Sequence, residues 1–351
     1  MPIQLHSLTD LAALPFDEVI DVRSPAEFAE DHLPGALNLP ALSNEERARV
    51  GTTYVQEDSF LARKIGAAMV ARNSANHLEG PLADRPGSWR PLVYCWRGGQ
   101  RSGSFASILS QIGWRADTID GGYRAYRRLV VKNLYDGEFP ARIVLIDGGT
   151  GTAKTRLLMH LKQQGAQILD LEGLAEHRGS LFGPTDLPQP SQKWFESMLA
   201  QKCLALDPSE PVFVEAESTR IGKIILPPAL TAAMRGAETV RLAAPIEARV
   251  AHLLTAYADL TKDQPALEAV LQKLVPYHGY ARVDHWRALA VRGALAELAR
   301  ELVECHYDPR YRRVSRNAPC RDLDLADLSD ATLAATAARL IDHERSADQT
   351  A

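Results

Sequence analysis

The most restrictive feature of this sequence is an apolar strand that leads through a glycine-rich loop into a helix. Residues 142–147 read Arg-Ile-Val-Leu-Ile-Asp, and residues 156–161 are good helix formers. The loop between them consists of Gly148, Gly149, Thr150, Gly151, Thr152, Ala153, Lys154 and Thr155. Glycines let backbone N–H groups approach phosphate oxygens, lysine adds positive charge, and the threonine hydroxyl can hold Mg²⁺. The pattern predicts a phosphate-binding loop in an α/β domain.

One position departs from the usual phosphate-binding loop. Ala153 stands where the motif has its second glycine, and we expect a helical conformation there, which alanine tolerates. The extra methyl group leaves open whether ATP or GTP binds. A later strand at residues 211–218 ends in Glu215 and Glu217, and we expect one of them beside a Mg²⁺ at Thr155, as in other folds of this kind. The alternative is an acidic strand end exposed to water.

A second constrained stretch surrounds Cys95. An apolar strand at residues 92–94 ends in this cysteine, and an Arg-Ser pair then opens a helix. The loop that follows Cys95, together with the arginine of the Arg-Ser pair, consists of Trp96, Arg97, Gly98, Gly99, Gln100 and Arg101. Inward-pointing N–H groups and the helix N-terminus favour a thiolate, and the two arginines can hold an oxyanion. We therefore predict a nucleophilic cysteine facing an anionic substrate.

The spacing around Cys95 leaves two chemistries open. A short Cys-x5-Arg-Ser loop can carry a persulfide or a selenium-bearing sulfur, and it can also be the phosphate-binding loop of a cysteine phosphatase. A third interpretation is structural, with Cys95 as a small apolar residue at a strand end. Two glycines and two arginines suit an anion cradle better than a strand end, so we favour a functional loop.

Composition excludes several classes of protein. The 351 residues are 46% hydrophobic and 24% charged, as in ordinary globular proteins, and their length predicts two or three domains. No apolar run is long enough to span a membrane, and the N-terminus lacks the features of a signal peptide. Four scattered cysteines form no CxxC pair, so we predict a reducing, cytoplasmic compartment and no structural zinc site.

Several segments in the first third resemble a rhodanese domain in the right order. They are residues 20–28, residues 32–40, the Cys95 loop, and Asp120-Gly121-Gly122-Tyr123. The resemblance implies that Cys95 carries transferable sulfur. We expect an α/β chain with a rhodanese-like sheet domain at 1–130, a linker at 131–140 and a parallel-sheet P-loop domain at 141–243. A helical region at 244–343 is appended to it, and a disordered tail follows at 344–351.

Two basic segments interleave arginine with tyrosine. With a net charge of −4, binding to a polyanion requires segregated charge, and these segments are our candidates. Their arginines are Arg124, Arg127, Arg128, Arg310, Arg312, Arg313 and Arg316. A solvated helix face is the alternative for the first segment. Two polar stretches with aromatic residues, 177–183 and 189–196, are expected to form a substrate lid.

The combination of motifs resembles the bacterial tRNA 2-selenouridine synthases over nearly the full length. The resemblance rests on the Cys95 loop, the P-loop with alanine in place of its second glycine, Pro190-Ser191-Gln192 with Phe195-Glu196, and His306-Tyr307-Asp308-Pro309. The resemblance implies exchange of sulfur for selenium at the 2-position of the wobble uridine of tRNA, with selenophosphate as donor. It also implies an S-geranyl intermediate made from geranyl diphosphate. A selenophosphate-producing enzyme is then an expected partner.

On this interpretation Cys95 and residues 96–101 serve the selenophosphate step, and residues 148–155 hold the diphosphate. Two alternatives remain. One is a cysteine phosphatase fused to an ATPase, and the other is a P-loop RNA kinase or RNA-binding ATPase in which the rhodanese part is only a scaffold.

Overall fold

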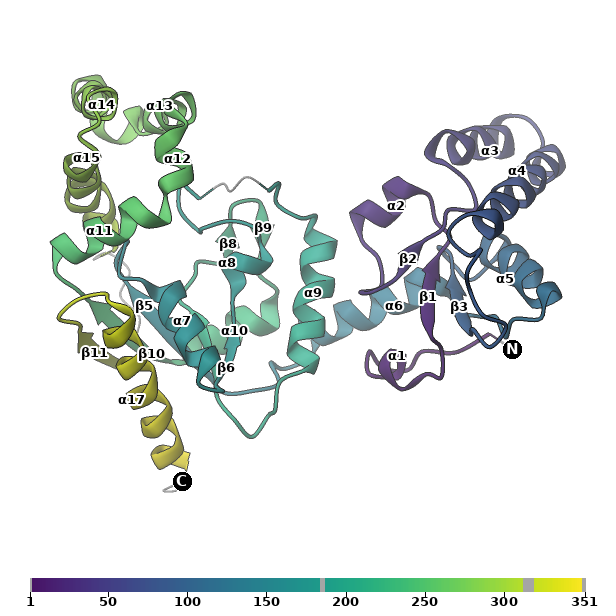
Figure 1. Ribbon diagram of the computed structural model, residues 1–351, viewed down its shortest axis with the longest axis horizontal. Coiled ribbons are helices and arrows are strands. Elements are labelled where there is room, and N and C mark those ends of the chain that lie inside the picture. The colour runs from purple at the N-terminus through teal and green to yellow at the C-terminus, as the bar shows by residue number, and fades with distance from the viewer. Residues whose placement is uncertain (1, 184–186, 312–318, 349–351) are drawn as a thin grey trace. The chain divides into compact units, whose positions relative to one another are not determined.

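The structure is a computed structural model that describes residues 2–183, 187–311 and 319–348. The chain divides into two compact units (Figure 1). Unit 1 comprises Met1–Glu138 and Pro190–Ala205, and unit 2 comprises Phe139–Gln189 and Leu206–Ala351. Each unit contains a parallel sheet flanked by helices, which confirms the predicted α/β class.

Unit 1 is built on a four-stranded parallel sheet in the order β2-β1-β3-β4. Its strands are β1 (Glu18–Asp21), β2 (Leu37–Asn38), β3 (Pro91–Tyr94) and β4 (Asp117–Thr118). Its helices are α1 (Asp10–Ala13), α2 (Pro25–Glu30), α3 (Asn44–Gln56), α4 (Ser59–Glu79), α5 (Gln100–Ile112), α6 (Gly122–Val131), the π-helix η1 (Lys132–Asp136) and α9 (Gln192–Leu204).

Local sequence signals set the helix starts in unit 1. Ser24 begins α2 with a capping box, in which the Glu27 carboxylate accepts a 3.0 Å hydrogen bond from the Ser24 N–H. Ser43 makes the same arrangement with Glu46 at the start of α3. The sheet packs on an apolar core that includes Val93, Phe105 and Leu109, and this core fixes the strand that ends at Cys95.

Unit 2 contains a five-stranded parallel sheet in the order β11-β10-β5-β7-β6. These strands are β5 (Ile143–Gly148), β6 (Gln167–Leu169), β7 (Val212–Glu215), β10 (Glu238–Ala243) and β11 (Cys320–Asp324); β8 (Arg220–Ile221) and β9 (Ile224–Ile225) form a small antiparallel pair. The helices around the sheet are α7 (Lys154–Gln163), α8 (Leu171–Leu174), α10 (Pro228–Gly236) and α17 (Asp330–Asp348). Helices α7 and α17 share one apolar cluster with β5 and β10.

A helical subregion extends from the same unit, as the sequence predicted. It contains α11 (Ile246–Ala256), α12 (Ala258–Lys262), α13 (Gln264–Gln272), α14 (Val275–Val291), α15 (Leu295–Leu302), the π-helix η2 (Val303–Tyr307) and α16 (Asp308–Tyr311). Its separate core is centred on Trp286, whose side chain is fully buried. Gly279, with φ +75°, breaks α14 into two segments. The kink is the interruption that Tyr277-His278-Gly279-Tyr280 marks in the sequence.

The expected character of three segments was wrong. The stretch 131–140 is helical as far as Asp136, because Leu134 is buried against unit 1. The C-terminal stretch is not a disordered tail from residue 344, because α17 continues to Asp348. Glu344 is buried there and accepts a 2.8 Å hydrogen bond from Arg142. The region after residue 244 is also not purely helical, since β11 returns to pair with β10.

No helix in the described part of the chain is long and apolar enough to cross a membrane.

Candidate functional site

The Cys95 thiol sits in a nest of hydrogen-bond donors at the end of β3. Its Sγ accepts a 3.3 Å bond from the Gly99 N–H and a 3.2 Å bond from the Ser102 hydroxyl. Burial acts to raise the thiol pKa, but the Ser102 hydroxyl and the backbone N–H groups of residues 97, 99 and 102 outweigh it. The pKa of Cys95 is therefore below its ordinary value, as a nucleophile or sulfur carrier requires.

Gly122, which follows β4, and Gly98, within the loop, allow the Cys95 loop to pack closely against the 120–123 segment. A Cβ on Gly122 would overlap the Cys95 carbonyl oxygen and would come within 2.6 Å of the Gly98 nitrogen. With this close approach, the Tyr123 N–H donates to the Cys95 carbonyl at 2.9 Å. Gly98 itself has φ +68°, a conformation that favours glycine. The Asp120-Gly121-Gly122-Tyr123 segment is thus the support of the cysteine loop.

The two arginines of the loop have different surroundings. Arg101 donates to the Glu27 carboxylate at 2.8 and 3.3 Å. Although burial opposes it, this pairing helps to lower the pKa of Glu27 to about 2. Arg97 is exposed and has no ion pair with any described residue. Of the predicted anion cradle, the structure leaves Arg97 and the backbone amides open to a ligand, with Gln100 exposed and Trp96 half-buried beside them.

The second site lies where β5 leads into α7. The loop has left-handed backbone at Gly151, with φ +86°, and at Ala153, with φ +61°. The helical conformation expected for Ala153 was wrong, because the residue before Lys154 turns the chain as a glycine would. A left-handed alanine costs about 1 kcal/mol or more. Lys154 Nζ donates to the Gly148 carbonyl at 3.1 Å, inside its own loop.

An arginine and an aspartate from the helical subregion hold the outer side of this loop. Arg249 on α11 donates from Nε to the Thr150 carbonyl at 2.9 Å. Its two terminal nitrogens bind both carboxylate oxygens of Asp308, at 3.0 and 2.7 Å. A Cβ on Gly149 would come within 3.0 Å of the same guanidinium. Sequence analysis missed Arg249, although Asp308 belongs to the His306-Tyr307-Asp308-Pro309 motif that it singled out.

Three carboxylates meet on the other side of Lys154. Ligand atoms of Glu172, Glu215 and Glu217 lie within 4.8 Å of one another. Glu215 ends β7 directly beside β5, is fully buried, and has neither carboxylate oxygen in a hydrogen bond with a described residue. Burial raises the pKa of Glu215 to about 7, against the opposing charge of Lys154. Burial and the neighbouring carboxylates raise that of Glu172 to about 9.

This acidic cluster fits a divalent cation. A buried carboxylate without a donor is stabilised by a metal, and oxygen ligands are those that Mg²⁺ prefers. Thr155 lies close enough to Glu215 to lower its pKa, which places its hydroxyl with the carboxylate. The predicted pair Glu215 and Glu217 is therefore brought together at the P-loop. Sequence analysis did not single out Glu172, which lies on the short helix α8.

The Arg/Tyr segment on α6 is mostly structural. Tyr123 and Tyr126 are each 2% exposed, so neither ring is available for stacking on a base. Arg127 forms ion pairs with Glu196 and Asp31. Of the arginines on this helix, only Arg124 and Arg128 are exposed.

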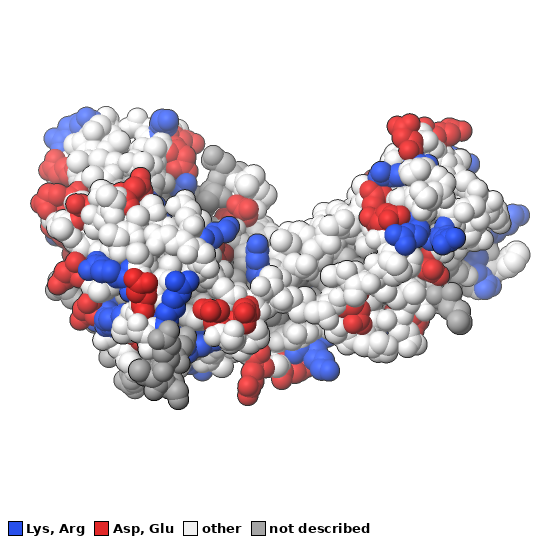
Figure 2. Space-filling model, turned by 60° about the horizontal axis from the view of Figure 1, so that its bottom comes forward, with Lys and Arg blue, Asp and Glu red and all other residues white. Residues whose placement is uncertain are grey.

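The second Arg/Tyr segment is described only in part. Arg310 donates to the His306 carbonyl at 3.0 Å and lies over the Tyr277 ring. Arg312, Arg313 and Arg316 lie outside the described residues. Sequence analysis missed two exposed aromatic residues close to the Gly279 kink, Tyr277 at 62% and Tyr280 at 69%. Figure 2 shows basic and acidic side chains interspersed on the face it displays, so charge there is segregated only locally.

The expected lid at 189–196 was wrong. Residues from Gln192 onward form α9, which packs within unit 1 against α6. Glu196, 1% exposed, pairs with Arg127 and accepts a 2.6 Å bond from the Tyr135 hydroxyl. Trp194 stacks on His32 at 4.0 Å between ring centroids. The Ser191-Gln192 and Phe195-Glu196 motif therefore anchors this helix to unit 1.

Known proteins similar to this chain agree with the two-unit architecture. Residues 5–129 match the model of the rhodanese-like domain, and residues 141–280 match that of the tRNA 2-selenouridine synthase AAA domain. A tRNA 2-selenouridine synthase from Nitrosomonas europaea is 40% identical over 71% of this chain and 66% of its own length. Enzymes of the same name from Nitrosomonas eutropha and Bdellovibrio bacteriovorus are 36% and 33% identical over 72% of this chain.

The aligned part covers 66% of the Nitrosomonas eutropha relative and 67% of the Bdellovibrio bacteriovorus relative, so this chain spans about two thirds of their length. The chain belongs to the tRNA 2-selenouridine synthase family.

Proposed function

We propose that this chain is a tRNA-modifying transferase that replaces the sulfur of 2-thiouridine at the wobble position by selenium. The observation that carries the proposal is the presence, in one chain, of two anion cradles with different chemistry. One surrounds a thiol of lowered pKa with N–H donors. The other places a lysine in a glycine-rich loop beside buried carboxylates. The names of the relatives support the same substrate class.

The P-loop serves the first step, geranylation of the tRNA sulfur. The sulfur of 2-thiouridine attacks C1 of geranyl diphosphate, the C–O bond breaks, and pyrophosphate leaves with the bonding electrons. Lys154 and the amides of residues 148–155 stabilise the negative charge that develops on pyrophosphate. Thr155 and Glu215 would hold a Mg²⁺, which supplies further neutralisation of that charge when bound.

The Cys95 loop serves the second step. An S-alkylated sulfur leaves as geranylthiol, whereas the unmodified thiocarbonyl sulfur is a poor leaving group. The selenium of selenophosphate attacks C2 of the base and the C–S bond breaks with release of geranylthiol. Water then attacks phosphorus, so that the P–Se bond breaks, its electrons stay on selenium and phosphate leaves. Cys95 and its donor nest position the selenophosphate, and Arg97 with the loop amides holds the donor's oxyanion.

Transfer RNA would contact exposed cations and aromatic rings. Arg124 and Arg128 are available for phosphates, and Tyr277 and Tyr280 are available for base stacking. Arg312, Arg313 and Arg316, which lie outside the described residues, are further candidates for phosphate contacts.

The alternatives explain less of the geometry. A cysteine phosphatase needs the arginine after the loop to bind phosphate, but the Arg101 guanidinium is paired with Glu27. An RNA kinase or RNA-binding ATPase leaves the donor nest around Cys95 without a role.

Nucleoside mass spectrometry tests the proposal. Wild-type protein, Cys95→Ala and Lys154→Met are incubated with 2-thiouridine tRNA, geranyl diphosphate and selenophosphate. We expect 2-selenouridine from the wild type, accumulated S-geranyl-2-thiouridine from Cys95→Ala, and neither product from Lys154→Met. Unchanged nucleosides with the wild type, together with phosphate release from ATP or a phosphoester, would favour the alternatives.

A further inference from the structure

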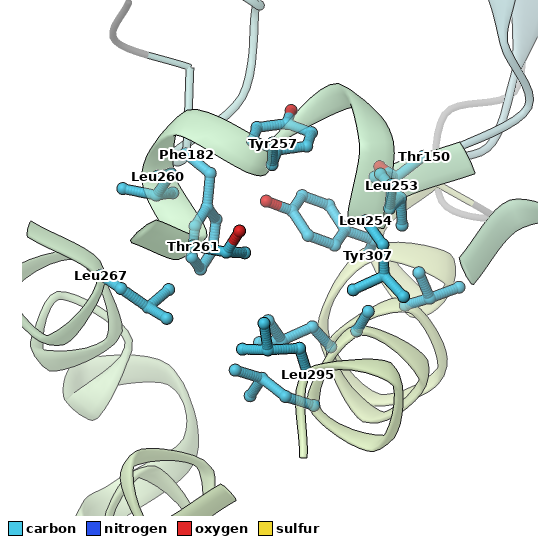
Figure 3. A pocket seen from close by; sticks show the side chains of 14 residues that line it. Thr150, Phe182, Leu253, Leu254, Tyr257, Leu260, Thr261, Leu267, Leu295 and Tyr307 are labelled. Atoms are coloured by element: carbon cyan, nitrogen blue, oxygen red, sulfur yellow. The ribbon is translucent and has the colours of Figure 1, made fainter. Parts of the chain in front are cut away.

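An apolar pocket in unit 2 adjoins the P-loop. It encloses a cavity of about 70 Å³ that opens to solvent. Thr150 belongs both to the P-loop and to the pocket lining. The other lining residues come from the 182 loop and from helices α11, α12, α13, α15 and η2. In Figure 3, Thr150 lies at one edge beside Leu253, and Leu267 lies at the opposite edge.

The lining selects the chemistry of the occupant. Ten of the fourteen lining residues are Leu, Val, Ala or Phe, and none of the fourteen is charged. The polar atoms are hydroxyls, and two of these have partners already. Thr261 donates to the Ala258 carbonyl of its own helix at 3.2 Å, and the Tyr257 hydroxyl lies 3.4 Å from that of Ser180. Such a surface holds a hydrocarbon and offers little to the polar edges of a nucleobase.

The pocket and the loop share their supporting residues. Tyr307 lines the pocket, and the next residue, Asp308, binds the Arg249 guanidinium that donates to the Thr150 carbonyl. A Cβ on Gly151 would come within 3.1 Å of Leu253, another lining residue. One set of contacts therefore fixes the anion-binding loop and the apolar wall beside it.

We propose that this pocket binds the hydrocarbon tail of an isoprenoid diphosphate whose diphosphate occupies the P-loop. The inference rests on the proposed function and gives its alkyl donor a binding site. The shared residue Thr150 sets the direction, with the head at the loop and the tail extending toward Leu267. The ligand is thus an amphiphile, and the P-loop of this chain recognises an isoprenoid diphosphate in preference to a nucleotide.

Calorimetric titration of the full chain in the presence of Mg²⁺ tests the proposal. The probes are geranyl diphosphate, dimethylallyl diphosphate, inorganic pyrophosphate and ATP. Each buried methylene group contributes about fourfold in affinity. We therefore expect geranyl diphosphate to bind at least roughly 100-fold more tightly than pyrophosphate, with dimethylallyl diphosphate between them. ATP should bind no more tightly than pyrophosphate. Only the isoprenoids should bind with a strongly negative heat-capacity change.

A matched pair of variants tests the location. Ala299 on α15 lines the pocket, and Ala296 on the same helix is exposed and does not line it. Ala299→Phe places a ring in the cavity and should weaken geranyl diphosphate at least tenfold. Pyrophosphate affinity should change less than twofold, and Ala296→Phe should leave both affinities unchanged. Thermal melting checks that both variants are folded.

The outcomes separate the pocket from the proposed function. Equal affinity for geranyl diphosphate and pyrophosphate, or equal effects of the two phenylalanine variants, would overturn the pocket assignment and leave the P-loop step in place. If Ala299→Phe weakens the binding of geranyl diphosphate and Lys154→Met does not, the hydrocarbon site stands and the placement of the diphosphate in the P-loop is overturned. If neither geranyl diphosphate nor pyrophosphate binds, both the pocket assignment and the proposed P-loop step fail.

Discussion

The ion pair between Arg249 and Asp308 should contribute more to stability than any surface pair of the same type. Their side chains are 10% and 25% exposed, and they share two hydrogen bonds of 3.0 and 2.7 Å. Removing one partner of a fully buried pair costs about 3–5 kcal/mol. Because Asp308 is partly exposed, we expect Asp308→Ala to lower the free energy of unfolding of unit 2 by about 2–3 kcal/mol.

The loss should reach the P-loop. Arg249 without Asp308 is a nearly buried charge that is free to leave the Thr150 carbonyl. We therefore expect pyrophosphate affinity to fall by about tenfold, and the melting temperature of unit 2 to fall by about 5–10 °C. A double-mutant cycle with Arg249→Met isolates the pair, and its coupling energy should be about 1.5–3 kcal/mol. Chemical denaturation and calorimetric titration provide the two measurements.

The same helix supplies a control pair. Glu247 on α11 pairs with Arg300 at 3.1 Å, but these side chains are 71% and 41% exposed. Glu247→Ala should cost less than about 1 kcal/mol and should not change pyrophosphate binding. Two results would contradict this role of the pair. One is that Asp308→Ala lowers the free energy of unfolding no more than Glu247→Ala does. The other is that Asp308→Ala destabilises unit 2 without any change in pyrophosphate affinity.

Four further predictions concern other parts of the chain. Ser102→Ala removes a donor to the Cys95 thiolate, so ultraviolet titration should show a raised thiol pKa, and an unchanged titration would contradict the nest. The folded state protonates Glu172 up to about pH 9, whereas its ordinary pKa is 4.5, so stability present at low pH is lost as pH rises between these values. Glu172→Gln should therefore stabilise the protein more at pH 8.5 than at pH 5, and the two gains in the free energy of unfolding should differ by roughly 1 kcal/mol or more. Equal effects at both pH values would argue against the raised pKa. Gly122→Ala should destabilise unit 1 by at least about 2 kcal/mol, because its Cβ overlaps the Cys95 carbonyl, and a melting temperature like that of the wild type would contradict this packing. Arg128→Ala should reduce the salt dependence of tRNA binding by about one counterion without changing stability, and an unaltered slope would remove Arg128 from the interface.

Sequence patterns predicted the parts of the fold that depend on local chemistry. The apolar run before Gly148, the capping box at Ser24 and the glycines around Cys95 each restrict the backbone locally, and the structure has the expected strand, helix and loops. The strand β11 was missed, because Cys320–Asp324 is short and only half apolar. Its pairing with β10 depends on a distant part of the chain.

Roles that depend on tertiary partners could not be predicted. Arg101, Arg127 and Arg128 look equivalent in the sequence, but Glu27 and Glu196 pair with the first two, whereas Arg128 is exposed. The left-handed conformation of Ala153 is imposed by its loop and contradicts the preference of alanine. The apolar pocket is assembled from several helices, so no single motif marks it.

The division of labour between the two loops can be tested by supplying the intermediate directly. Transfer RNA that already carries S-geranyl-2-thiouridine is incubated with selenophosphate and either Lys154→Met or Cys95→Ala, and nucleosides are measured by mass spectrometry. We expect Lys154→Met to form 2-selenouridine at nearly the wild-type rate, because the P-loop step has been bypassed, and we expect Cys95→Ala not to form it. Failure of Lys154→Met to convert the supplied intermediate, or conversion by Cys95→Ala, would contradict this division of labour.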